Sequence, residues 1–273
     1  MVLTIDIGNT KTKVAVFDGE QLLKHVVIEY FNKNDIDVLV SQFKSFESVI
    51  ISSVSVDEEC RIAQLLEENG IKYCLLSYKL QLPFEIDYLT PETLGKDRIA
   101  ALAGAYAVGG VGNYLVIDCG TCNTYDLLVD EHFVGGNIAP GLQMRLDAMH
   151  YFTAALPQCS IENVQLKMHN AQLGLTTHEA ILNGAYWGVV HEINGYIEKY
   201  SEEYNDLKVI LTGGLFAILN AQCSTNGLKL KQKMLKAQFD IIHNISNTSL
   251  PVVYEPMLVP KGLNFIAKNI QNK

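Results

Sequence analysis

The chain contains one pattern twice, and this repeat limits the fold more than any other feature of the sequence. In each copy an apolar strand ends at an aspartate, a glycine turn with a hydroxyl residue follows, and a second β-rich strand leads to another turn. The first copy runs from Asp6 to Thr10, and the second, about 112 residues later, runs from Asp118 to Cys122. This period is too long for a solenoid repeat. We therefore expect two related domains, 1–112 and 113–273, with a cleft between them.

The periodicity of each half predicts a mixture of strands and helices. In the first half we expect two strands around the Gly8 turn, a third strand at about 22–28, helices at 34–45, 57–69 and 91–108, and the short strands SVIISSV and KYCLLS. In the second half we expect three strands, helices at 141–154 and 176–200, the strand KVILTGG and a closing helix at 257–271. This order predicts an α/β protein with a mixed sheet flanked by helices in each half.

Length and composition limit the class of protein. With 273 residues, 48% of them apolar and 19% charged, the chain is long enough for two globular domains. Its apolar runs are shorter than the roughly 20 residues of a membrane-spanning helix, and its first residues lack the pattern of a signal peptide. We therefore expect a cytoplasmic protein that does not bind membranes. The formal charge of -9 argues against a broad nucleic-acid-binding face.

The second copy also contains a C-x-x-C sequence, Cys119-Gly120-Thr121-Cys122. A zinc site needs two further ligands at suitable spacing, and the chain has no second C-x-x-C. A redox C-x-x-C usually begins a helix, whereas strands flank this one. We therefore expect Cys119 to pack inward, and we expect the glycine turn, not the two thiols, to be the functional feature of this segment.

The chemistry of the two turns suits phosphate binding. Glycine lets backbone N–H groups approach an oxyanion without a Cβ in the way, and the hydroxyls of Thr10 and Thr121 can donate to phosphate. Asp6 and Asp118 would repel phosphate directly, so a cation is expected between each carboxylate and the phosphates. A single D-x-G-[NT] segment usually marks an ordinary β-turn. The second copy, together with the Thr212-Gly213-Gly214 turn, favours a polyphosphate site, although no P-loop sequence is present.

Several segments, in order and spacing, resemble the type III pantothenate kinases, members of the acetate and sugar kinase/Hsp70/actin superfamily. They are the turn from Asp6 to Thr10, LGKDRIAALAGA, DCGTCNTYD, GGNIAPGLQMRLDAM with TAALP, GLTTHEAILNGAYWG, VILTGG and EPMLVPKGLNFIAKN. The resemblance covers nearly the whole chain, except residues 220–250, which support no claim about function. It implies two duplicated ribonuclease H-like (actin-like ATPase) domains, each a mixed five-stranded sheet flanked by helices.

The resemblance also implies an activity, the ATP-dependent phosphorylation of pantothenate to 4'-phosphopantothenate at the start of coenzyme A synthesis. Asp97 matches the general base that takes the proton from the pantothenate hydroxyl. The residues that match the pantothenate pocket are Tyr88, Gly95, Lys96, Asp97, Arg98 and Thr177. Charge pattern alone would make Asp97 and Arg98 a solvated pair in a helix first turn, and Tyr88 a half-exposed loop residue.

Thr177 has a structural interpretation beside the functional one. Thr176 and Thr177 form an N-cap pair before the expected helix at 176–200, and Glu179 supplies part of a capping box. Both interpretations hold if one threonine caps the helix and the other contacts the ligand.

For the nucleotide and its cations the resemblance implies a second set of residues. The nucleotide-binding residues are Asp6, Ile7, Gly8, Asn9, Thr10, Lys11, Thr12, Lys13, Gly120 and Thr121. Asp118 would hold a monovalent cation (K+ or NH4+), and Asp6 would hold Mg2+ directly or through water. Lys13 is nearly as well explained as a solvated strand residue. Asp126 is a weaker candidate for this site, because it could simply end its strand. Cys122 stands where the family usually has a small residue such as alanine.

Two other functions compete with the first. The chain could be a non-catalytic relative that acts as an accessory regulator of transcription, or a kinase of another sugar or small alcohol. Asp97 and the two intact turns argue against the regulator, while Tyr88, the GKDR segment and Thr177 favour pantothenate. The resemblance also implies a homodimer, and whether its pantothenate pocket is shared between subunits does not follow from the sequence. Affinities, nucleotide base specificity and feedback regulation do not follow from the sequence.

Overall fold

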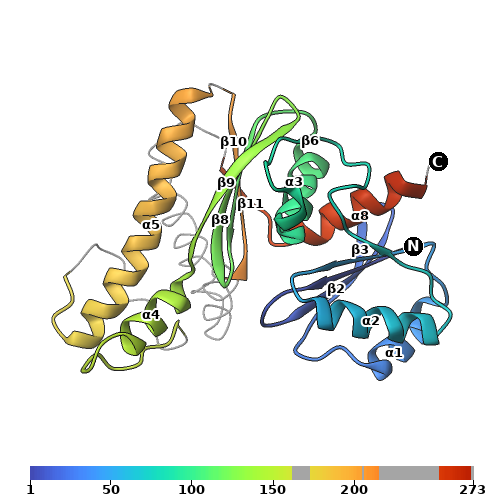
Figure 1. Cartoon of the computed structure of the whole chain (residues 1–273), viewed down its shortest axis with the longest axis horizontal. Coiled ribbons are helices and arrows are strands. Elements are labelled where there is room, and N and C mark those ends of the chain that lie inside the picture. Colours follow the sequence, from blue (N-terminus) through green and yellow to red (C-terminus); the bar gives the residue numbers. More distant parts are fainter. Residues whose placement is uncertain (162–172, 205, 215–251, 272–273) are drawn as a thin grey trace, which may run out of the picture. The chain divides into compact units, whose positions relative to one another are not determined.

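A computed structural model describes residues 1–161, 173–204, 206–214 and 252–271 (Figure 1). The segment 220–250, for which the sequence supports no function, lies outside these residues. The chain divides into two compact units, each described here by itself. Unit 1 comprises residues 1–112, 128–135 and 257–273, and unit 2 comprises residues 113–127 and 136–256.

Unit 1 is built on a five-stranded mixed sheet with the order β3-β2-β1-β4-β5. Its strands are β1 (Val2–Ile7), β2 (Thr12–Asp18), β3 (Gln21–Ile28), β4 (Ser48–Ser53) and β5 (Cys74–Leu75). Strand β1 is buried along its whole length, antiparallel to β2 and parallel to β4. The predicted meander of three strands and the sheet of five strands are both confirmed. Strand β3 alternates between exposed and half-buried residues, as expected at the edge of a sheet.

Two capped helices, α1 (Lys33–Phe43) and α2 (Val56–Glu68), follow β3 and β4 in the chain. Asn32 forms a capping box with Asp35, and the Ser55 hydroxyl accepts from the backbone N–H of Glu58. The buried face of each helix joins the strands in one hydrophobic cluster, which includes Ile5, Val14, Leu39, Ile51 and Ile62. This cluster stabilises the sheet from which the first turn projects.

The second sheet has six strands in the order β11-β10-β7-β8-β9-β6. They are β6 (Glu85–Ile86), β7 (Tyr114–Cys119), β8 (Cys122–Val129), β9 (His132–Pro140), β10 (Lys208–Thr212) and β11 (Val252–Tyr254). The residue patterns predict four of these strands and the resemblance implies five, so the sequence missed the short strands β6 and β11. The extra strand, β6, arises because the backbone N–H of Glu85 donates to Glu131 and that of Asp87 donates to Phe133. β10 runs parallel to both β7 and β11.

The expected helix at 91–108 is interrupted. A short 3-10 turn, η1 (Pro91–Thr93), precedes the helix α3 (Lys96–Gly109), for which Gly95 is the N-cap residue. The break matters because it makes Lys96 the first residue of α3, and places Asp97 in its first turn. The prediction of one continuous helix was therefore wrong at its N-terminal end.

Helix α3 packs closely against the C-terminal helix α8 (Leu258–Gln271) in unit 1 (Figure 1). A Cβ at Gly262 would lie 1.8 Å from the carbonyl oxygen of Ala100, and one at Gly104 would lie 2.2 Å from that of Leu258. These glycines let the two helix backbones approach. Close packing therefore groups α8 with the first half of the chain, which differs from the expected segment 113–273.

In the described residues of unit 2, the helices are α4 (Leu142–Tyr151) and α5 (Thr177–Glu203), and they pack against each other (Figure 1). Thr176 and Glu179 form the capping box that the sequence predicted at the start of α5. Among the described helices, none has both the length and the apolar character needed to cross a membrane.

Candidate active site

The first glycine turn connects β1 to β2, and a short hydrogen bond closes it. The backbone N–H of Gly8 donates to the carbonyl oxygen of Lys11 at 3.1 Å. Asn9, Thr10 and Lys11 are exposed, whereas Ile7 and Thr12, at the ends of the two strands, are buried. Of the predicted nucleotide-binding residues, Ile7 and Thr12 therefore offer a backbone rather than an accessible side chain.

Asp6 lies at the end of β1, opposite Lys13 of β2 and Ser52 of β4. Its carboxylate is 5% exposed, and its Oδ2 atom lies 3.5 Å from Lys13 Nζ. Burial raises the pKa of Asp6, the nearby Lys13 ammonium lowers it, and the negative charge of Asp97 raises it again. The pair is thus a buried carboxylate with a half-exposed counter-ion, and the contact of Lys13 with phosphate stays a prediction.

The first turn of α3 brings three charged residues together, and each has a different environment. Lys96 forms a partly buried ion pair with Glu59 of α2. The Oδ1 atom of Asp97 accepts from the backbone N–H of Arg98 at 2.9 Å, so the carboxylate is held at the helix N-terminus, where negative charge is favoured. Arg98 is 5% exposed. The solvated-pair interpretation of Asp97 and Arg98 is therefore wrong for Arg98.

Tyr88 lies against the Arg98 side chain. The ring of Tyr88 stacks on that of Phe133 at 5.7 Å between centroids, and the guanidinium of Arg98 lies 5.6 Å from the Tyr88 ring and 5.5 Å from the Phe133 ring. Cation–π attraction of this kind fixes the guanidinium in place. Phe133 was missed by the sequence analysis, because only the pairing of β6 with β9 places it beside Tyr88.

The structure thus brings together, within unit 1, most of the residues that are predicted to bind pantothenate. Tyr88 and the residues from Gly95 to Arg98 lie in or against the first turn of α3, and Asp97 is close enough to Asp6 to change its pKa. Thr177 is the first residue of α5 in unit 2 and is exposed. The role of Thr177 in pantothenate binding stays a prediction.

The second glycine turn, in unit 2, joins β7 to β8 through Gly120 and Thr121. The backbone N–H of Gly120 donates to Cys122 at 3.1 Å, and that of Gly141 donates to the carbonyl oxygen of Thr121 at 3.1 Å. A Cβ on Gly141 would lie 2.4 Å from that same oxygen. The start of α4 is therefore pressed directly against the turn.

A further glycine approaches the same turn from β10. Thr212 pairs with Asp118, and Gly213 has a φ of +104°. A Cβ on Gly213 would lie 2.4 Å from Asp118 Oδ1. The Thr212-Gly213-Gly214 segment that the sequence analysis noted therefore lies against Asp118, and only glycine fits there.

Cys119 and Asp126 have buried positions on β7 and β8. Cys119 is 0% exposed, and burial raises the pKa of its thiol, so it packs inward as predicted. Asp126 is also 0% exposed, so its carboxylate is not available at the surface of unit 2. Cys122 is half-buried, and the backbone of the turn accommodates it.

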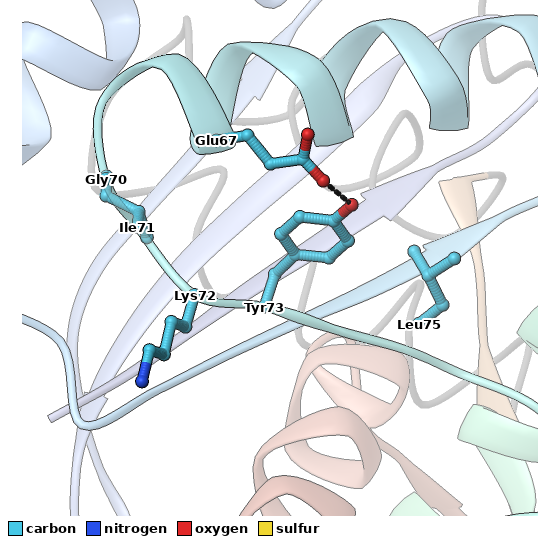
Figure 2. Close-up of a pocket in the computed structure, with 6 residues that line it drawn as sticks. All are labelled: Glu67, Gly70, Ile71, Lys72, Tyr73 and Leu75. Carbon is cyan, nitrogen blue, oxygen red and sulfur yellow. Dashed lines mark hydrogen bonds between the residues drawn. The ribbon is translucent and has the colours of Figure 1, made fainter.

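One surface hollow of unit 1 lies apart from the predicted site residues (Figure 2). It is lined by Glu67, Gly70, Ile71, Lys72, Tyr73 and Leu75, at the end of α2 and the start of β5. The Tyr73 hydroxyl donates to Glu67 at 2.7 Å. In the described part of the chain, no three His, Cys, Asp or Glu side chains gather closely enough to hold a metal ion on their own.

Comparison with known proteins identifies the relatives of this chain. A family model for type III pantothenate kinase matches residues 2–199, a span that contains every predicted site residue. A type III pantothenate kinase of Christiangramia forsetii is 40% identical over 227 residues, covering 81% of this chain and 88% of that protein. One from Bacteroides fragilis is 37% identical over 216 residues, covering 78% and 86%.

Solved structures share the fold at low sequence identity. A Campylobacter jejuni protein named as a Baf family transcriptional activator superimposes with a TM-score of 0.55 at 21% identity, over 99% of this chain and 100% of that one. A Listeria monocytogenes protein named as an N-acetylmannosamine kinase gives a TM-score of 0.52 at 11% identity, over 99% of each chain. These likenesses show the two-domain ribonuclease H-like fold of the sugar kinases, as predicted.

Proposed function

Because the chain belongs to the type III pantothenate kinase family, we propose that it transfers the γ-phosphoryl group of ATP to the hydroxyl of pantothenate. The product is 4'-phosphopantothenate, at the first step of coenzyme A synthesis. The observation that carries this proposal beyond the family match is the first turn of α3. There the Asp97 carboxylate accepts from the backbone N–H of Arg98, and the buried Arg98 guanidinium lies 5.6 Å from the Tyr88 ring.

This arrangement suits a substrate that carries both a carboxylate and a hydroxyl. Arg98 would bind the substrate carboxylate, since a guanidinium forms strong charge-assisted hydrogen bonds to carboxylates. Tyr88 and Phe133 hold the Arg98 side chain and would limit access of water to it. Gly95 and Lys96 would complete the pocket, with Lys96 held by Glu59.

Asp97 would act as the general base. Its Oδ1 atom is held by the backbone N–H of Arg98, which fixes the orientation of the carboxylate before substrate binds. In a loose phosphoryl-transfer transition state the alcohol needs orientation more than early deprotonation, and a nearby carboxylate can accept the proton late.

The two glycine turns would bind ATP. The segment from Asp6 to Lys13 would contact the phosphates through backbone N–H groups, the Thr10 hydroxyl and the Lys13 ammonium, and Gly120 and Thr121 would bind the nucleotide from unit 2. Asp6 offers hard oxygen ligands of the kind that suit Mg2+, which neutralises charge on the phosphates when bound. Asp118 would hold K+ or NH4+ through its carboxylate oxygens, as the family resemblance implies.

Further parts of the proposal rest on the family alone. We expect a cytoplasmic homodimer in which Thr177 contributes to the pantothenate pocket, with the boundary between the two domains near residue 112. The regulator hypothesis is not favoured, since the family match and the relatives point to the kinase. The likeness to a protein named as a transcriptional activator is at 21% identity and concerns the fold.

A coupled assay tests the proposed function. Purified protein with ATP, Mg2+ and K+ should turn over with pantothenate and not with N-acetylhexosamines. The control is the same protein preparation checked for folding by circular dichroism. A folded protein that phosphorylates a hexosamine, or that leaves pantothenate unchanged, would refute the proposal.

A further inference from the structure

Close to the second glycine turn in unit 2, the side chains of Tyr125 and Arg145 both bind the Glu192 carboxylate. The Tyr125 hydroxyl, from β8, donates to Glu192 Oε1 at 2.6 Å, and Arg145 Nη2, from α4, donates to Glu192 Oε2 at 2.6 Å. Both oxygens of this α5 carboxylate therefore accept a short hydrogen bond. None of the three residues belongs to the predicted substrate, nucleotide or cation sites.

The contacts continue from Glu192 back to the turn on both sides. On one side Arg145 Nε donates to the carbonyl oxygen of Pro140 at 2.8 Å, and the next residue, Gly141, donates its backbone N–H to Thr121. On the other side Asn123, two residues after Thr121, donates its side-chain amide to the Tyr125 hydroxyl at 3.5 Å. The result is a closed loop of hydrogen bonds and covalent bonds that begins and ends at Thr121.

Burial restrains the β8 side of this loop, whereas the Arg145 and Glu192 side chains are 21% and 25% exposed. Asn123 and Tyr125 are 0% exposed, and the Tyr125 ring stacks on that of Tyr196 at 4.1 Å between centroids. Burial, and then the hydrogen bond to Glu192, raise the pKa of Tyr125. The hydroxyl therefore keeps its proton and remains a donor throughout the usual assay range. Hydrogen bonds to charged groups inside a protein are stronger than those between neutral groups.

From this geometry we propose that Glu192 is a positioning residue for the nucleotide-binding turn, which it reaches through Tyr125 and Arg145. It contacts neither substrate nor phosphates. By holding β8 and the start of α4 together, it keeps the Gly120–Thr121 backbone in the conformation that receives the phosphates. This inference rests on the proposed role of Gly120 and Thr121 in binding ATP.

A role of Glu192 in positioning the second turn predicts different effects on nucleotide binding and on pantothenate binding. Glu192 lies fifteen positions along α5 from Thr177, which corresponds to about 22 Å along a helix axis. A change at Glu192 should therefore disturb the second turn more than the residue predicted to contact pantothenate.

The test uses two near-isosteric variants of the full chain. Glu192→Gln places amide donors opposite the Arg145 guanidinium, and Tyr125→Phe removes one hydroxyl while keeping the ion pair. Asp147→Asn is the matched control, because Asp147 is an exposed α4 carboxylate that accepts from Gln143 of the same helix at 2.8 Å. Dissociation constants for a non-hydrolysable ATP analogue, KM for both substrates and the unfolding temperature are measured for each.

We expect Glu192→Gln to weaken binding of the ATP analogue on the order of tenfold, and to leave KM for pantothenate unchanged. Tyr125→Phe should have a smaller effect in the same direction, and the double variant should lose less than the product of the two single losses. Asp147→Asn should match the parent. A purely structural role would lower the unfolding temperature and the active fraction while leaving both binding constants unchanged.

Unchanged nucleotide affinity in folded Glu192→Gln and Tyr125→Phe would overturn the inference, as would equal losses for ATP and pantothenate. If Glu192→Gln does not fold, Tyr125→Phe alone decides. If instead the proposed kinase function is wrong, the parent protein binds the ATP analogue but does not phosphorylate pantothenate. The affinities of the variants for the analogue still judge the role of Glu192 in that case.

Discussion

The two glycine turns share a sequence pattern but differ in what supports them. The first is held locally, by the Gly8–Lys11 hydrogen bond and by the pairing of Asp6 with Lys13. The second is enclosed by residues distant in the sequence, since Gly141 and Gly213 press against it. The same motif can therefore be stabilised either by its own hairpin or by the rest of its domain. Distant substitutions should affect the second turn far more than the first.

The largest expected effect concerns Asp97, which lies near the first turn. Asp97→Asn should keep the fold and ATP binding and lower kcat by about 10²–10⁴-fold, because the base is lost. The measurement is steady-state kinetics with a separate nucleotide-binding assay. Asp57→Asn, an exposed carboxylate in the first turn of α2, is the control and should retain activity. Near-normal turnover in Asp97→Asn would remove Asp97 as the base.

A glycine replacement tests the difference in support directly. Gly213→Ala adds a Cβ 2.4 Å from Asp118 Oδ1 at a residue with φ of +104°, and should lower the free energy of unfolding by about 1–3 kcal/mol. Gly8→Ala adds one 3.2 Å from the Lys11 carbonyl oxygen and should cost about 1 kcal/mol or less.

Urea unfolding of the two variants measures both changes, and the ATP-analogue affinity shows whether each turn still functions. Equal destabilisation by the two substitutions would show that the turns are supported alike, contrary to the comparison.

The cations should also distinguish the turns. Replacing K+ by Na+ should lower the rate several-fold through the site at Asp118, while Asp118→Asn should have a lower rate that no longer depends on which of the two ions is present. Initial rates in matched chloride salts measure this. A parent enzyme that is equally fast in Na+ contradicts the cation role of Asp118.

The smallest expected effect is a stability change at Asp6. Burial raises the pKa of Asp6, so the folded protein holds this proton more tightly than the unfolded chain does. Its contribution is therefore most favourable below the unfolded pKa of 3.8, and it is lost as pH rises through the folded pKa.

Asp6→Asn should accordingly raise the unfolding temperature by a few degrees at pH 7, and the difference should shrink at low pH. The same variant should bind ATP with Mg2+ less well. Thermal melts between acid and neutral pH measure the first effect, with Asp18→Asn, at the exposed end of β2, as the control. A variant that is less stable than the parent at pH 7 would show that the Lys13 pair outweighs the cost of burial.

Much of the fold could be predicted because the elements are long and periodic. The β1–β2–β3 meander, α2, α5 and α8 appear within a few residues of the expected ranges. The short strands β6 and β11 were missed, since two or three residues carry no alternation and become strands only through their partners. The break before α3 was missed because η1 continues the helical pattern across Gly95.

The candidate site divides in the same way. Tyr88 and the residues from Gly95 to Arg98 were predicted from motifs, and the structure brings them together. Phe133 and Glu192 have no motif, and their neighbours come from other elements. No sequence motif indicates the role of either residue, because tertiary contacts determine its neighbours.

The sequence by itself determined the duplicated α/β pattern, the two glycine turns, the family and the position of Asp97 near a helix start, because each depends on residues that are close in the chain. Only the tertiary structure decided that α8 packs on α3, that Gly213 lies against Asp118 and that Glu192 joins β8 to α4. Each of these contacts joins segments that are far apart in the sequence. Burial and close backbone approach bring such segments together only when the chain folds.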